Sequence, residues 1–206
     1  MYLLHILLLS ISILTAGVIH VPSDQPNIQA GINWASPGDT VLVSSGTYTG
    51  TGNYSINFYG KGIHLLSESG PDNTMIDLQG DRRGFFFDTN EDTTTIVEGF
   101  EVRNGYVCRD DSYYDSDYHN GYGGAVYINQ SYPKFVNMKF QYNDAKYRGS
   151  GVYIVDGGNA IFEDCYFQDN EYDYDSSNEG GAVAIYNASA TFRNTTFYNN
   201  GNNCHY

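Results

Sequence analysis

A repeat of about 30 residues in the second half of the chain constrains the fold more than any other feature. The segment Gly-Gly-Ala-Val-Tyr-Ile at 123–128 recurs as Gly-Ser-Gly-Val-Tyr-Ile at 149–154 and as Gly-Gly-Ala-Val-Ala-Ile at 180–185. An aromatic residue follows each copy, a second one comes five residues later, and an Asn stands three residues beyond it. The three sets are Phe135/Phe140/Asn143, Phe162/Phe167/Asn170 and Phe192/Phe197/Asn200. A repeat of this length is typical of a solenoid, in which each repeat packs only on its neighbours.

The side-chain alternation within each repeat indicates which kind of solenoid this is. Val126 and Ile128 point to one side of an extended segment while Tyr127 points to the other. No stretch of this half has apolar residues at helical spacing, so helical repeats and leucine-rich repeats fit poorly. The pattern therefore predicts an all-β parallel solenoid, with two or three short strands per coil and coils stacked at ~4.8 Å.

Stacked coils place equivalent residues above one another, which makes specific columns predictable. We expect Phe140, Phe167 and Phe197 to stack in the core. Polar side chains fit inside only if they pair along the stack, so the three Asn of the repeat are predicted to form an amide ladder at one corner: Asn143, Asn170 and Asn200. If the Phe residues were out of vertical register, the fold assignment would fail.

The first half of the chain is less regular but has the same alternation of apolar residues. Inward-facing pairs are predicted at Ile56/Phe58, Ile63/Leu65, Ile76/Leu78, Phe85/Phe87 and Phe100/Val102. Before them, residues 26–35 have apolar side chains at helical spacing. We expect a short amphipathic helix that caps the first coil, with Asp24 or Gln25 as its N-cap and Pro26 at its first position. Residues 18–206 are thus predicted to form one β-helix domain.

The charge balance excludes one class of partner. The chain has 10 Lys and Arg against 24 Asp and Glu, a formal net charge of −14. Such a surface repels phosphate backbones and anionic lipid headgroups, so we expect no nucleic-acid partner.

Residues 1–17 have the features of a secretory signal peptide. Their apolar stretch, residues 6–14, is too short for a membrane-spanning helix and is followed by small residues, which predicts cleavage near Gly17. The alternative is an anchor that is kept. Signal removal implies a secreted or outer cell-surface protein with no membrane insertion. The three cysteines are too scattered for a disulfide framework, and Cys165 falls at an inward position of a predicted strand.

Two sequence patterns carry a resemblance to known families. Val21-Pro-Ser-Asp24, Gly38-Asp-Thr-Val41 and Gly46-Thr-Tyr48 look like the opening of the pectate-lyase-like superfamily. The pairing of Gly-Gly-Ala-Val with Phe-x-x-Asn is similar to the repeat of chlamydial-type polymorphic outer membrane proteins. These resemblances imply a right-handed single-stranded parallel β-helix. Because the chain ends just past an Asn corner, where a further Gly bend is due, we expect the domain to be C-terminally incomplete.

Three insertions, at 104–122, 144–148 and 171–179, follow the Asn corners and are predicted to share one side of the solenoid. Exposed tyrosines beside carboxylates suit contact with a polysaccharide or surface glycan. The candidate ligand-binding residues are Tyr114, Asp115, Asp117, Tyr118, Tyr172, Asp173, Tyr174 and Asp175. Asp115, Asp117, Asp173 and Asp175 also have the oxygen ligands that Ca²⁺ prefers, and no other cofactor or metal is expected. The alternative is a solvated loop surface that keeps the solenoid soluble.

Enzymatic function is the second hypothesis. The superfamily resemblance implies either Ca²⁺-dependent lyases with a catalytic Arg or Lys, or paired carboxylates. Asp110 and Asp111 with Arg148 are the catalytic candidates that match the first arrangement. The chain lacks polygalacturonase and pectinesterase signatures. We therefore expect a non-enzymatic, adhesin-like or carbohydrate-contacting protein, with a polysaccharide lyase or hydrolase for uronic-acid polymers, or a degenerate relative, as the alternative.

Overall fold

Stacked parallel β-sheets and one short helix make up the computed structural model, which describes residues 16–80, 82–107, 121–172 and 181–201. Sheet A contains β1 (Val18–Val21), β2 (Thr40–Val43), β5 (His64–Ser67), β8 (Ile96–Glu98), β12 (Lys134–Val136), β16 (Asn159–Glu163) and β20 (Ser189–Arg193). Sheet B contains β3 (Gly46–Tyr48), β6 (Thr74–Asp77), β9 (Glu101–Arg103), β13 (Lys139–Gln141), β17 (Tyr166–Gln168) and β21 (Thr196–Tyr198). Sheet C contains β4 (Ile56–Asn57), β7 (Phe85–Phe87), β11 (Val126–Asn129), β15 (Val152–Val155) and β19 (Val183–Tyr186).

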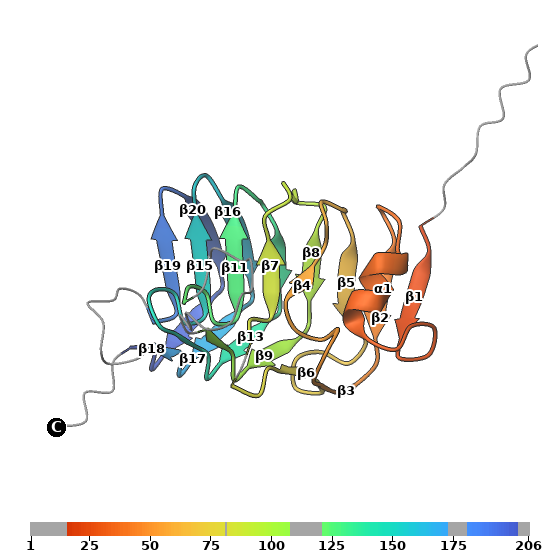
Figure 1. Ribbon diagram of the computed structural model, residues 1–206, viewed down its shortest axis with the longest axis horizontal. Coiled ribbons are helices and arrows are strands. Elements are labelled where there is room, and N and C mark those ends of the chain that lie inside the picture. Colours follow the sequence, from red (N-terminus) through yellow and green to blue (C-terminus); the bar gives the residue numbers. More distant parts are fainter. Residues whose placement is uncertain (1–15, 81, 108–120, 173–180, 202–206) are drawn as a thin grey trace, which may run out of the picture.

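The chain visits these sheets in a fixed order. From β2 onward it passes from sheet A to sheet B to sheet C and returns to sheet A one strand further along. Each strand pairs in parallel with its equivalents in the coils before and after it, as between β12 and its neighbours β8 and β16. Figure 1 shows the coils following one another along the long axis, from β1 to β19. The arrangement is consistent with a parallel β-solenoid.

A small fourth sheet was not expected from the sequence. Sheet D contains β10 (Tyr106–Val107), β14 (Asp144–Ala145) and β18 (Glu171–Tyr172). These residues fall in the first part of the three insertions, for which the sequence predicts loops. They pair instead because the backbone stays stacked for two residues beyond the Asn corner, where the Asp144 N–H donates to the Gly105 carbonyl at 2.7 Å.

The core consists of aromatic columns in the predicted register. Phe140 is paired with Phe167, and Phe167 with Phe197, and their ring centroids are 4.8 and 4.9 Å apart. A second column stacks Phe135 on Phe162 at 5.0 Å. All the inward pairs of the first half are also buried. The rings repeat at about the coil spacing, so a ring inside a column is covered on each face by a different neighbour.

Corner residues turn the backbone between sheets by taking a left-handed conformation. Asp and Asn adopt this conformation more readily than other non-glycine residues. The corners between sheets A and B have φ of 50° at Asn137, 55° at Asp164 and 47° at Asn194. The corners that follow the strands of sheet C also have a residue with positive φ, at Asn90, Gln130, Asp156 and Asn187. The 20 asparagines of the chain thus include many that shape the turns.

The helix α1 (Ile28–Trp34) lies where the sequence predicts one, but its cap differs. Asn27 is the N-cap, and its side chain accepts a hydrogen bond from the Ala30 N–H at 2.8 Å. The expected cap at Asp24 or Gln25 is wrong, because the Asp24 carboxylate accepts from the His20 N–H at 2.8 Å in the turn after β1. The buried faces of Ile28 and Ile32 join the core. Across the described ranges, no helix has the length and apolar character that crossing a membrane requires.

Candidate functional site

Most of the predicted ligand-binding residues lie outside the described residues. This holds for Tyr114, Asp115, Asp117, Tyr118, Asp173, Tyr174 and Asp175, and for the catalytic candidates Asp110 and Asp111. The backbone of Tyr172 is described and pairs with Ala145 in sheet D. Residues 108–120 and 173–180 each follow a strand of sheet D and precede a strand of sheet C in the sequence. The described surface nearest to them in sequence is therefore that of sheets C and D.

The ladder residues are brought together at the corner after sheet B. Asn143 Nδ2 donates to Asn170 Oδ1 at 3.0 Å, and Asn170 Nδ2 donates to Asn200 Oδ1 at 2.8 Å. Each amide nitrogen also donates to a backbone carbonyl, that of Val102, Phe140 or Phe167. The side chains of Asn143 and Asn170 are thus bound on every side and stabilise the corner, with no group free to bind a ligand.

The outer face of sheet C has an aromatic column of its own. Tyr127 is paired with Phe86 on one side and Tyr153 on the other, and all three are buried. The centroids of Phe86 and Tyr127 are 5.1 Å apart, and those of Tyr127 and Tyr153 are 5.9 Å apart. Burial raises the pKa of both tyrosine hydroxyls. These two phenols therefore stay neutral near pH 7 and act as apolar support rather than as bases.

Arg83 holds the bend that leads into this column. Its Nε donates to the Gly123 carbonyl at 2.9 Å, and its Nη2 donates to the Tyr122 carbonyl at 2.7 Å. The guanidinium carbon lies 5.4 Å from the Phe86 ring centroid and 5.2 Å from that of Tyr127. These contacts fix the backbone of Tyr122 at the edge of the column.

Four residues beside this column form what we call the tyrosine patch: Tyr122, Tyr147, Arg148 and Tyr186. The Tyr122 ring lies 4.9 Å from Tyr153 and 5.2 Å from Tyr147. The Arg148 guanidinium lies 5.8 Å from the ring centroid of Tyr186, which is 56% exposed. Tyr122, Tyr147 and Arg148 are half-buried. The patch thus presents aromatic faces, phenol hydroxyls and a guanidinium on a rigid base.

Among the residues that the structure describes, groups that perform acid–base, nucleophilic or metal chemistry are not assembled at this patch. Within the described ranges, no group of three His, Cys, Asp or Glu side chains is arranged to hold a metal ion. Burial raises the pKa of the Cys165 thiol to about 12, so it is unreactive and fills the core. The fully buried Glu91 carboxylate accepts hydrogen bonds from the Gly60 N–H and the Ser131 hydroxyl. The patch is suited to binding by stacking and hydrogen bonding.

Of this patch, sequence reasoning identified Arg148 alone. Tyr122, Tyr147 and Tyr186 belong to no motif, and they come together only because three coils stack. The available signal was the alternation that turns Tyr127 outward, which repeats at Tyr153 and marks sheet C as the sheet with an aromatic outer face.

No protein-family model matches this chain, and neither a curated protein nor a solved structure matches it.

Proposed function

We propose that this protein is a secreted or cell-surface β-solenoid that contacts carbohydrate through the tyrosine patch and has no enzymatic activity. The observation that carries the proposal is the exposed Tyr186 ring beside Arg148, whose backbone forms a β-bridge with that of Tyr122. A sugar ring has an apolar C–H face that stacks on an aromatic ring, and hydroxyls that bond to phenol and guanidinium groups. The glycan partner is a polysaccharide or a surface glycan.

Rigidity of the patch favours this function. The aromatic column beneath it is buried, and Arg83 ties the Tyr122 bend to the column. Side chains that are already ordered lose little conformational entropy when a ligand binds. A surface patch of this kind gains affinity from several weak contacts along an extended polymer.

The same proposal extends to the type of solenoid and to its first coil. We place the chain with right-handed parallel β-helices of the pectate-lyase-like type, since connections between parallel strands are right-handed in about 98% of cases. We also assign α1 as the cap of the first coil, because it packs on β1, β2 and β4. Such a cap covers strand edges that would otherwise pair with other chains.

Glycan binding by purified variants tests the proposal. Tyr186→Ala and Tyr147→Ala should each weaken binding of an array-identified polysaccharide about tenfold, because each removes one stacking surface, worth about 1.4 kcal/mol. Tyr132→Ala is the matched control, since Tyr132 is also exposed, at 43%, but lies outside the patch. Equal losses in all three variants, or no glycan binding by the wild type, would refute the assignment.

An assay for cleavage of uronic-acid polymers distinguishes the enzymatic alternative from the proposed binding function. The wild type should leave pectate and alginate intact in the presence of Ca²⁺. If the wild type raises the absorbance of unsaturated uronates and Arg148→Ala does not, the protein is a lyase rather than a non-enzymatic binding protein.

A further inference from the structure

Four copies of the N-glycosylation motif Asn-x-Ser/Thr have no role in the tyrosine patch. They are Asn53-Tyr-Ser55, Asn129-Gln-Ser131, Asn187-Ala-Ser189 and Asn194-Thr-Thr196. The motif places a hydroxyl two residues after the asparagine that accepts the glycan. A glycan is bulky and hydrated, so a folded chain carries it only where the asparagine amide points to solvent. The structure therefore decides which copies of the motif can carry one.

Two of the four asparagines have amides that the fold encloses. Asn53 is 8% exposed, its Oδ1 accepts from the Ile28 N–H at 3.1 Å, and its Nδ2 donates to the Thr49 carbonyl at 2.9 Å. Asn129 is the last residue of β11, where it is half-buried and its Oδ1 has no contact with solvent. A sugar attached to either amide would displace the residues packed around it.

The other two asparagines lie at the corners on either side of β20. Asn187 follows β19 with φ of 55°, and Asn194 follows β20 with φ of 47°. Both side chains are exposed. Asn194 Nδ2 donates to the Asp164 carboxylate. An N-linked sugar replaces one of the two amide hydrogens and leaves the other to donate, so this bond does not block the acceptor.

The exposure of these two corners does not depend on their place in the stack. The equivalent corner residues in coils that have a neighbour on each side are also left-handed and exposed: Gln130 and Asp156 for Asn187, and Asn137 and Asp164 for Asn194. Corner side chains are thus directed to solvent throughout the solenoid.

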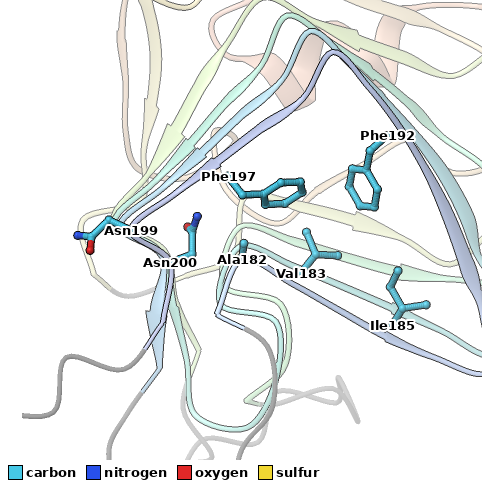
Figure 2. A pocket seen from close by; sticks show the side chains of 7 residues that line it. All are labelled: Ala182, Val183, Ile185, Phe192, Phe197, Asn199 and Asn200. Atoms are coloured by element: carbon cyan, nitrogen blue, oxygen red, sulfur yellow. The ribbon is translucent and has the colours of Figure 1, made fainter.

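Figure 2 shows this direction at the corner after β21. Asn199 points away from the interior of the coil, whereas Phe197 points into it. Asn199 is also left-handed and exposed, but Gly201 stands two residues after it, so the hydroxyl of the motif is absent. The same coil therefore contains a corner asparagine that has the exposure without the motif.

We propose that Asn187 and Asn194 carry N-linked glycans and that Asn53 and Asn129 do not, which rests on the secreted or cell-surface location proposed above. The co-reactant is a sugar chain carried on a lipid diphosphate, presented by a glycosyltransferase of the secretory membrane. The asparagine Nδ2 forms a bond to the anomeric carbon of the first sugar and gives up one proton. The bond from that carbon to the phosphate oxygen breaks, and the lipid diphosphate leaves with its electron pair.

Mass spectrometry of the full chain produced in cultured animal cells tests the proposal. Enzymatic removal of N-glycans in water labelled with heavy oxygen converts each glycan-bearing asparagine to a labelled aspartate. The label is expected at Asn187 and Asn194, whereas Asn53, Asn129 and Asn199 should stay unlabelled. An unmodified Asn187 or Asn194, or a label at Asn53 or Asn129, would overturn the assignment.

Substitution of the hydroxyl separates the motif from a general effect on the fold. Ser189→Ala and Thr196→Ala should each remove one glycan although the acceptor asparagine is still present, and Ser189→Thr should keep both glycans, because Thr also supplies a hydroxyl. Ser55→Ala is the matched control and should leave the glycosylated mass unchanged apart from the substitution itself. Two glycans on Ser189→Ala or on Thr196→Ala would contradict the proposal.

Failure of this inference is distinguishable from failure of the binding function. Secreted protein that binds polysaccharide but has unmodified Asn187 and Asn194 would overturn the glycosylation alone. Glycosylated protein that binds no polysaccharide would overturn the binding function alone. Protein that is retained inside the cell without glycans would overturn both the location and the glycosylation.

Discussion

Buried polar side chains hold neighbouring coils together at the scale of single residues. Asn170 makes hydrogen bonds to Asn143 on one side and Asn200 on the other, and it also donates to the Phe140 carbonyl. Glu91 joins Gly60 in one coil to Ser131 in another. Both side chains are fully buried, so the loss of either leaves neighbouring donors or acceptors without a partner.

Asn170→Ala should lower the free energy of unfolding by about 3 kcal/mol, because a buried unsatisfied group costs about 1–3 kcal/mol and several lose their partner. Asn33→Ala is the control, since Asn33 is exposed on α1 and Ala favours helix. Urea denaturation followed by circular dichroism measures both. Equal stabilities of the two variants would mean that the ladder contributes nothing.

The lowered pKa of Glu91 predicts how the free energy of unfolding depends on pH. Burial raises the pKa of its carboxyl, but hydrogen bonds from Thr89, the Gly60 N–H and Ser131 outweigh burial and hold the pKa below its ordinary value. A lowered pKa stabilises the fold above the unfolded value of about 4.3, and this contribution is lost as the pH falls through the folded pKa. Glu91→Gln should therefore lose about 1–3 kcal/mol at neutral pH and less in acid. Chemical denaturation at several pH values measures the difference, and a pH-independent loss would contradict this origin.

Tight bends set the geometry at the scale of the strand. Gly149 has φ of 63°, and a Cβ placed there would lie 2.2 Å from the Val152 carbonyl oxygen. The bend turns the chain directly into β15, so the backbone folds back against the strand that follows. Neither Ala nor any larger residue fits without moving that strand.

Gly149→Ala should destabilise the protein by more than 3 kcal/mol or prevent folding, because it combines left-handed strain with a backbone clash. Gly80→Ala is the matched control: φ is 76° and nothing lies within 4 Å of the added Cβ. This control should lose only about 1 kcal/mol of conformational strain. Thermal unfolding measures the melting temperatures of Gly149→Ala and Gly80→Ala. Similar melting temperatures of the two variants would show that the backbone at 149 moves to relieve the clash.

At the scale of the whole molecule, successive coils have equivalent residues at equivalent corners and core positions. Asn137 and Asp164 occupy equivalent corners, and Phe140 pairs with Phe167 one coil later. Each coil contacts mainly its two neighbours, so stability is approximately a sum over coils and their interfaces.

Deletion of residues 138–164, one coil, should leave a folded protein of lower stability, because it joins Asn137 directly to the equivalent strand of the next coil. Deletion of residues 138–165 should abolish folding, since a shift of one residue turns Phe167 from the core to solvent. Thermal unfolding and the mass in solution distinguish the two deletion variants, because a folded variant unfolds cooperatively and does not aggregate. A folded second variant would show that strand register tolerates a slip.

The columns of the core could be predicted from sequence because stacking converts a linear period into vertical contacts. The spacings of 27 and 30 residues between equivalent Phe and Asn were sufficient to pair Phe140 with Phe167 and Asn170 with Asn200. The N-cap of α1 was predicted at the wrong residue, since Asp24 makes a competing local hydrogen bond to His20. Local competition of this kind is decided by turn geometry, which composition does not specify.

The amino-acid sequence by itself determined the all-β class, the parallel stacking and the identity of the core columns, because each depends on a period that repeats along the chain. The tertiary structure alone decided the tyrosine patch. Tyr122, Tyr147 and Tyr186 share no motif and become neighbours only when their coils stack.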